Sequence, residues 1–265
     1  MLGFLSMKTD RVIAIVGLAL TALVVAAAFL VLDATTYDIG GAAIVVPVLL
    51  LLSIPVLQRQ ARREEDPTIF RLLLFALVLK LLASFLRYYV DFHVYGGATD
   101  ALGYHHAGIR WSDALSAGGL GNQGQGLTGT NFIELVTGVV YLVIRPTLLG
   151  GYLVFSWLSY WGLYFFYRAF VEAVPEGRSR TYALLVFFLP SLLFWPSGIG
   201  KEAWMIFTLG IASFGAAKLF AGRIVPGLSG VSRRRLSSDW RLAQCAGAGC
   251  AGRRSSGARA TSDGF

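Results

Sequence analysis

Charged side chains inside an otherwise apolar segment are the first candidates for chemistry in this sequence. Lys80, Ser84, Arg87 and Asp91 follow one another at i, i+4, i+7 and i+11, which places them on one face of a helix. Charges in a membrane span are costly, so this face is expected to contact protein, water or a charged ligand. The two cations would lie about 10 Å apart along the axis, which suits a lipid phosphate at the outer leaflet. Alternatively, Arg87 extends to the headgroup layer and Lys80 pairs with a carbonyl or an acid of another helix.

Asp100 is the strongest candidate for a general base. Thr99 is suited to the N-cap of a short helix through Trp111, and in that helix Asp100 and Tyr104 share a face at i, i+4. A carboxylate held just above a membrane can take a proton from an incoming hydroxyl, as glycosyl transfer to an alcohol requires. In the simpler interpretation, Asp100 only caps a helix in a solvated loop.

The histidines give a third interpretation of the same segment. His93, His105 and His106 are the three histidines of the chain, and they fall within fourteen residues. In this interpretation His93, Asp100 and His105 form a metal site, although no HxxxH or HExxH spacing supports it. The sequence therefore identifies no particular cofactor, although these residues are compatible with a divalent metal.

Residues 194–204, FWPSGIGKEAW, form the last informative patch. Proline and two glycines break the chain, and Lys201 and Glu202 then fall in the first turn of the next helix. A lysine is unfavourable at this end of the helix dipole. Either it holds a phosphate or it pairs with Glu202 or Asp100. Lys201 and Glu202 are accordingly candidate substrate-binding residues.

The composition indicates what must position these groups. Of the 265 residues, 55% are hydrophobic and 14% are charged, and the mean hydropathy is +0.63, which excludes an ordinary soluble domain. The formal charge of +8 is concentrated in residues 223–265, which hold eight Arg against two Asp. The rest of the chain has no basic face of the kind that follows a phosphate backbone, so nucleic acid is not expected as a partner.

The apolar segments predict an all-α, polytopic bundle in residues 1–222. The candidate spans are Val12–Leu32, Gly41–Leu57, Ile69–Val90, Leu148–Tyr167, Thr181–Trp195 and Ala203–Phe220; we expect about five spans in total. Residues 132–144 are apolar but make a helix of only about 20 Å, too short to cross. We therefore place them in an interfacial helix after a long outer loop, residues 91–131.

The distribution of Lys and Arg supports this topology. Within residues 1–223, with Lys80 left uncounted at mid-membrane, these cations divide eleven inside to four outside if residues 132–144 lie along the outer interface, whereas a crossing would divide them eight to seven. Cytoplasmic loops collect Lys and Arg. The predicted location is thus the cell inner (plasma) membrane, with several spans and a cytoplasmic amino terminus.

Residues 223–265 are predicted to be a disordered, basic, low-complexity tail. Arg, Ala, Gly and Ser dominate from Ser229 onward, and such a segment buries too little apolar surface to fold. The abrupt change of composition suggests a truncated or out-of-frame end. The alternative is a cytoplasmic tail held near anionic lipid.

The segment TDALGYHHAG, together with the short interfacial helices and surrounding spans, resembles the GT-C superfamily of polyprenyl-phosphate-sugar-dependent glycosyltransferases. Asp100 and Tyr104 are similar to the acidic-then-aromatic signature of that family's outer loop, and the resemblance covers roughly residues 68–222.

This resemblance implies transfer of a sugar from a lipid-linked phosphate donor to a hydroxyl acceptor at the outer face. Asp100 would be the base, with Asp91 as the second candidate. Arg87 and Lys201 would hold the donor phosphate, and Tyr104 and His105 would line the sugar pocket. The implied partners are the lipid-linked donor and membrane lipid.

Two other classes stay open. An envelope polysaccharide polymerase or ligase would share the lipid-linked substrate. A non-enzymatic transporter or assembly component would account for Lys80 and Arg87 without a role for Asp100.

Overall fold

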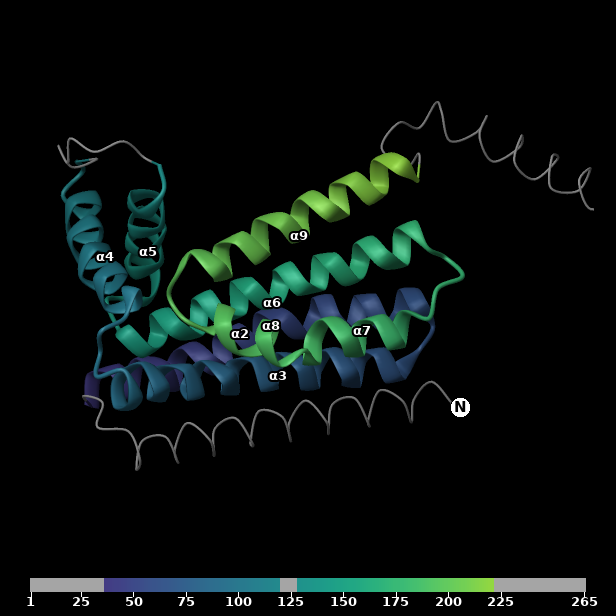
Figure 1. Cartoon of the computed structure of the whole chain (residues 1–265), viewed down its shortest axis with the longest axis horizontal. Helices are drawn as coiled ribbons and strands as arrows, with labels where there is room; N and C mark the ends of the chain where they lie inside the picture. The colour runs from purple at the N-terminus through teal and green to yellow at the C-terminus, as the bar shows by residue number, and fades with distance from the viewer. Residues whose placement is uncertain (1–35, 120–127, 222–265) are drawn as a thin grey trace, which may run out of the picture. The chain divides into compact units, whose positions relative to one another are not determined.

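The computed structural model describes residues 36–119 and 128–221, and this part of the chain is built from helices without a strand (Figure 1). The predicted all-α class is therefore confirmed for these residues. In chain order the elements are α2 (Thr36–Glu64), α3 (Pro67–Tyr89), η1 (Val90–Val94), α4 (Asp100–Ser116), α5 (Thr130–Ile144), α6 (Leu148–Ala173), α7 (Ser179–Phe188), α8 (Pro190–Phe194), η2 (Trp195–Ser197) and α9 (Lys201–Phe220). The predicted span Val12–Leu32 and the predicted tail, residues 223–265, lie outside the described residues.

Three of these helices are long and apolar enough to cross a membrane: Gly40–Glu64, Pro67–Val94 and Lys201–Phe220. A fourth crossing is added if α5 and α6, which meet at a bend of 110°, are counted as one broken span. These helices support the prediction of a membrane protein. The predicted total of about five spans is not confirmed.

The predicted span Thr181–Trp195 is not one continuous helix. It is divided into α7, α8 and the 3-10 turn η2, with a break at Leu189, whose ψ of 121° is extended. Pro190 explains the break, because a proline disfavours helical geometry at the residue before it and has no N–H to donate. α7 has 10 residues, about 15 Å of helix, which is too short to cross alone.

Lys80, near the middle of α3, binds the segment that follows this break. Its side chain is buried, and its ammonium donates hydrogen bonds to the carbonyl oxygens of Leu192 (2.7 Å) and Leu193 (3.2 Å) in α8. The last carbonyls of a helix have no partner within that helix. Lys80 therefore supplies hydrogen-bond donors to carbonyls of α8. This agrees with the alternative prediction, in which Lys80 pairs with a carbonyl or an acid of another helix.

α6 joins the neighbouring helices through polar side chains. Tyr160 donates to the carbonyl of Leu73 (3.0 Å), Trp157 to the hydroxyl of Ser53 (2.8 Å), and Ser156 to the carbonyl of Lys80 (2.8 Å). Polar groups in an apolar surrounding need such internal partners. These bonds fix α6 against α2 and α3.

Glycines allow two pairs of helices to approach closely. A Cβ at Gly162 of α6 would meet the backbone of Ile206 in α9, and a Cβ at Gly210 would meet the backbone of Gly162. In the same way, a Cβ at Gly138 of α5 would meet Trp111 of α4. Small residues permit this backbone contact between membrane helices.

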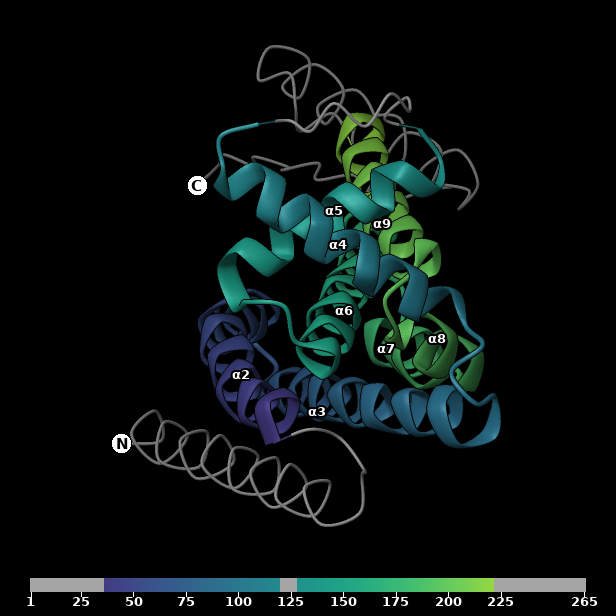
Figure 2. The ribbon, with the colours of Figure 1, turned by 90° about the vertical axis from the view of Figure 1, so that its left-hand side faces the viewer.

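α4 and α5 form a pair at the end of the bundle where α3 ends and α6 begins (Figures 1 and 2). Thr99 is the N-cap residue of α4, as predicted, but the helix continues to Ser116 instead of ending near Trp111. α5 covers the predicted interfacial helix at residues 132–144. Figure 1 shows the pair running across the long helices.

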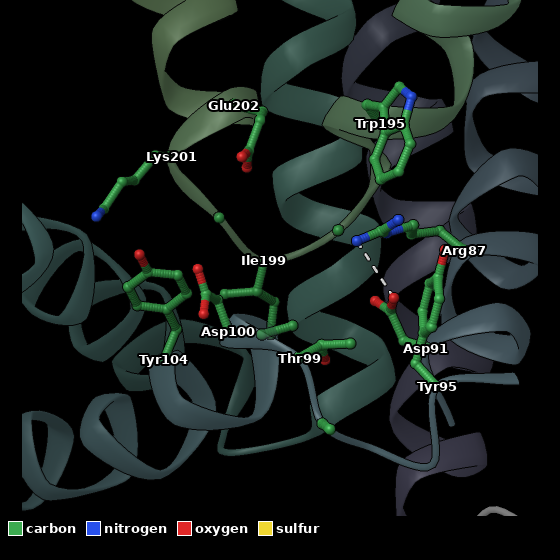
Figure 3. A pocket seen from close by; sticks show the side chains of 14 residues that line it. Arg87, Asp91, Tyr95, Thr99, Asp100, Tyr104, Trp195, Ile199, Lys201 and Glu202 are labelled. Atoms are coloured by element: carbon green, nitrogen blue, oxygen red, sulfur yellow. Dashed lines mark ion pairs between the residues drawn. The ribbon is translucent and has the colours of Figure 1, made fainter. Parts of the chain in front are cut away.

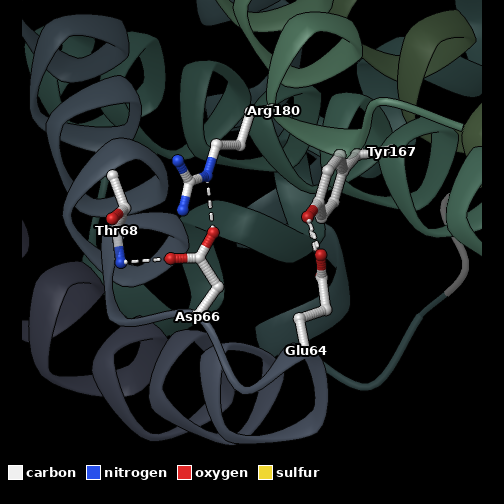
Figure 4. A network of polar contacts seen from close by, with 5 residues as sticks. All are labelled: Glu64, Asp66, Thr68, Tyr167 and Arg180. Carbon is white, nitrogen blue, oxygen red and sulfur yellow. Dashed lines mark hydrogen bonds and ion pairs between the residues drawn. The ribbon is translucent and has the colours of Figure 1, made fainter.

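The opposite end of the bundle is held by a separate polar network (Figure 4). Asp66 accepts a hydrogen bond from the backbone N–H of Thr68 (2.9 Å) and forms an ion pair with Arg180 (2.6 Å). The hydrogen bond from Arg180 holds the pKa of the Asp66 carboxyl below its usual range. Tyr167 donates to the carboxylate of Glu64 (2.6 Å).

Candidate functional site

A cavity of about 310 Å³ lies where α3, α4 and α9 meet (Figure 3). Four elements supply its walls: the end of α3 with η1, the turn that precedes α4, the first turns of α4, and the linker from η2 into α9. Six of the eight predicted site residues line this cavity: Arg87, Asp91, Asp100, Tyr104, Lys201 and Glu202. The other lining residues are Tyr95, Ala98, Thr99, Ala101, Trp195, Gly198, Ile199 and Gly200.

Asp91 forms the floor of the site as a fully buried carboxylate. Oδ1 lies 3.2 Å from Nη2 of Arg87, and Oδ2 accepts a hydrogen bond of 2.7 Å from the hydroxyl of Tyr152 in α6. The pair is formed at i, i+4 in the helical segment that continues from α3 into the π turn η1. A buried charge persists only if it is paired and hydrogen-bonded. Asp91 therefore orients Arg87: Oδ2 is held by Tyr152, whereas Oδ1 faces the guanidinium as an ion pair and accepts no hydrogen bond in the described part of the chain.

Arg87 is held from two further sides. Its guanidinium carbon lies 5.2 Å from the ring centre of Phe194 and 4.9 Å from that of Trp195, so both rings make cation–π contacts. Nη1 donates no hydrogen bond to any group in the described part of the chain. A positioned arginine with an unused donor is suited to an oxyanion, because its hydrogen bonds to phosphate are strengthened by charge.

Asp100 and Tyr104 enter the cavity from the first turns of α4 (Figure 3). Asp100 is exposed and Tyr104 is 4% exposed. They share a helix face, as predicted from their spacing. Asp100 forms no ion pair within 4.0 Å among the described residues, so its carboxylate is available to a ligand.

Lys201 and Glu202 begin α9 on the opposite wall, and both are exposed. Within residues 36–119 and 128–221, neither forms an ion pair, so the predicted pairing of Lys201 with Glu202 or Asp100 is not seen. Gly200 precedes them, and a Cβ at this position would meet the carboxylate of Glu202. The ammonium of Lys201 and the N–H groups at the start of α9 together favour an anion at this wall.

Two predicted substrate-binding residues lie outside the cavity. Lys80 is engaged by α8, as described above. His105 faces α5, where its Nδ1 lies 2.6 Å from the hydroxyl of Tyr141. Burial and the adjacent His106 lower the pKa of His105. The structure thus gives His105 a role in packing α4 against α5 and does not bring it to the predicted sugar pocket.

The histidines do not form a metal site in the described part of the chain, where no group of three His, Cys, Asp or Glu side chains is close enough to hold an ion. His93 stacks on Tyr89, with ring centres 4.4 Å apart. The proposed set of His93, Asp100 and His105 is therefore not assembled.

Two residues that contact the site were not predicted from the sequence. Tyr152 binds Asp91, and Trp195 contacts Arg87. A tyrosine in an apolar span carries a hydroxyl that needs a hydrogen-bond partner. The sequence therefore indicates that Tyr152 has a polar partner, but it does not identify Asp91 as that partner.

Comparison of the chain with known proteins finds no matching protein-family model, no matching curated protein and no matching solved structure.

Proposed function

We propose that the chain is a membrane glycosyltransferase of the GT-C type, which it resembles, and that it transfers a sugar from a polyprenyl-phosphate donor to a hydroxyl acceptor. One observation carries the proposal: a single cavity is lined by two cations, Arg87 and Lys201, and by the exposed carboxylate of Asp100. The cations suit the donor phosphate, and the carboxylate suits the acceptor proton.

The proposed reaction exchanges one bond at the anomeric carbon of the sugar. The bond from this carbon to the phosphate oxygen breaks, and its electron pair leaves with the lipid phosphate. Arg87 and Lys201 stabilise the charge that develops on the leaving oxygen. The acceptor oxygen forms the new bond to the anomeric carbon, and its proton passes to the carboxylate of Asp100.

Asp91 is the weaker candidate for the base. Its side chain is fully buried, and its oxygens contact Arg87 and Tyr152. We assign Asp91 as a positioning residue for Arg87.

We place the cavity at the outer face of the inner membrane, with the amino terminus in the cytoplasm. Arg62 and Arg63 lie in the last turn of α2, and Arg168 donates to Gln60 at the same end. Arg180 is bound there as well. This concentration of cations supports a cytoplasmic position for the end opposite the cavity, with about five spans and α5 along the outer interface.

The environment of Lys80 favours an enzyme over a transporter. The transport hypothesis explains the presence of Lys80 and Arg87 in a membrane span by a role in transport. Lys80 has carbonyl partners in α8, and Arg87 is paired with Asp91. Both charges are accounted for without a transport path.

The experiment is sugar transfer by the purified full chain in lipid nanodiscs, with radiolabelled hexoses linked to undecaprenyl phosphate and methyl glycosides as acceptors. Because Asp100 acts as general base, D100N should lower kcat roughly 100-fold or more with unchanged expression. D113N, an exposed aspartate on α4 outside the cavity, is the matched control. Transfer by D100N at the wild-type rate, or no transfer of any hexose by the wild type, would refute the proposal.

A further inference from the structure

A second hollow, of about 520 Å³, lies between α4 and α5. Its own walls carry His106 and Arg110 from α4 and Thr130 and Glu134 from α5. It shares Thr99, Asp100, Tyr104 and Lys201 with the first cavity. The proposed base therefore lines both hollows.

The second hollow is charged but electrically balanced. Asp100 and Glu134 carry negative charge, whereas Arg110 and Lys201 carry positive charge. None of the four forms an ion pair within 4.0 Å in the described part of the chain, although they line one space. Opposite charges held apart in this way offer hydrogen-bond donors and acceptors to a ligand that lies between them, and their zero sum favours an uncharged ligand.

The walls of this hollow are held by close packing of α4 against α5. A Cβ at Gly108 would meet Thr137, and one at Gly138 would meet Trp111. The contact between His105 and Tyr141 ties the same two helices together. Arg110 and Glu134 are thus carried on helices with a fixed separation, and a preorganised site loses less entropy when it binds a ligand.

We propose that this second hollow is the acceptor site and that it takes a neutral saccharide. The proposal rests on the proposed transfer reaction. A saccharide presents many hydroxyls that both donate and accept hydrogen bonds, which matches a wall that carries carboxylate acceptors together with guanidinium and ammonium donors. The donor phosphate occupies the first cavity, beside Arg87. The acceptor hydroxyl gives its proton to Asp100 on the shared wall as its oxygen bonds to the anomeric carbon.

The test uses R110A and E134Q in the purified full chain, with E176Q and R178A as matched controls at exposed positions of the loop between α6 and α7. Two readouts are measured: initial rates of hexose transfer from undecaprenyl phosphate to methyl glycosides, and saturation-transfer NMR of the same methyl glycosides. Loss of one hydrogen bond to a charged group should raise the acceptor KM about ten-fold or more. The donor KM should stay within about two-fold, because the first cavity is unchanged.

The outcomes separate the two proposals. A raised acceptor KM and a weakened NMR signal in R110A and E134Q, with both controls like the wild type, would support the acceptor site. An unchanged acceptor KM, an effect on the donor KM alone, or no methyl glycoside signal with the wild type would overturn it. If the wild type binds methyl glycosides through Arg110 and Glu134 but transfers no hexose, the transfer reaction is refuted and the saccharide site stands.

Discussion

Replacing Asp91 by asparagine tests how the site holds Arg87. D91N keeps an oxygen that can accept from Tyr152 but removes the charge that faces the guanidinium, 3.2 Å away. Breaking a buried pair costs about 3–5 kcal/mol, whereas an exposed pair contributes about 0–1 kcal/mol. The side chain of Asp91 is 0% exposed and that of Arg87 is 16% exposed, so this pair is closer to the buried case. We therefore expect D91N to lower the free energy of unfolding by roughly 2–3 kcal/mol.

A double-mutant cycle isolates the pair itself. Unfolding of D91N, R87M and D91N/R87M by SDS in mixed micelles, followed by circular dichroism, gives the coupling free energy. We expect the double mutant to be more stable than the sum of the single changes by about 2 kcal/mol, because no unpaired charge is left. The control is D66N, whose partner Arg180 is 58% exposed, so that a smaller loss is expected. Coupling below about 0.5 kcal/mol, the usual additivity error, would show that Asp91 does not hold Arg87.

Two further predictions concern the packing of the helices. G162L should prevent the close approach of α6 and α9, because its side chain would collide with the backbone of Ile206. We expect the free energy of unfolding in SDS to fall by about 1–3 kcal/mol or more, as is typical of overpacking. G215L is the control and should be tolerated, because a Cβ at Gly215 meets no neighbouring atom. The lowered pKa of His105 predicts that stability falls as the pH drops below about 6.5, since the unfolded chain then binds the proton more readily. H105Q should weaken this dependence between pH 7 and 5; an identical pH profile would contradict it.

Spacing along one helix was the most informative part of the sequence. Asp100 and Tyr104 reach the same cavity because i and i+4 share a face. His105 follows one residue later, about 100° around the helix, and therefore faces Tyr141 in α5. The same rule that places Asp100 correctly could have excluded His105 from the sugar pocket.

Contacts between distant segments could not be predicted in the same way. The partners of Lys80 are carbonyl oxygens, which every residue carries, so no residue type marks Leu192 and Leu193. Pro190 was a visible signal for the break before them. The second hollow depends on the packing of α4 against α5 through glycines, and the sequence alone does not show that Arg110 and Glu134 line one hollow.

The clamp between Lys80 and α8 also has a consequence for biosynthesis. The first carbonyl that accepts from Lys80 lies 112 residues later in the chain. At about 5–20 residues per second, synthesis of this interval takes on the order of 10 s. During that time the ammonium of Lys80 in the newly inserted α3 lacks the carbonyl acceptors that α8 later provides. The ammonium of Lys80 must therefore be solvated by water, lipid headgroups or the insertion machinery until α8 is made, and the contact between α3 and α8 forms only after that.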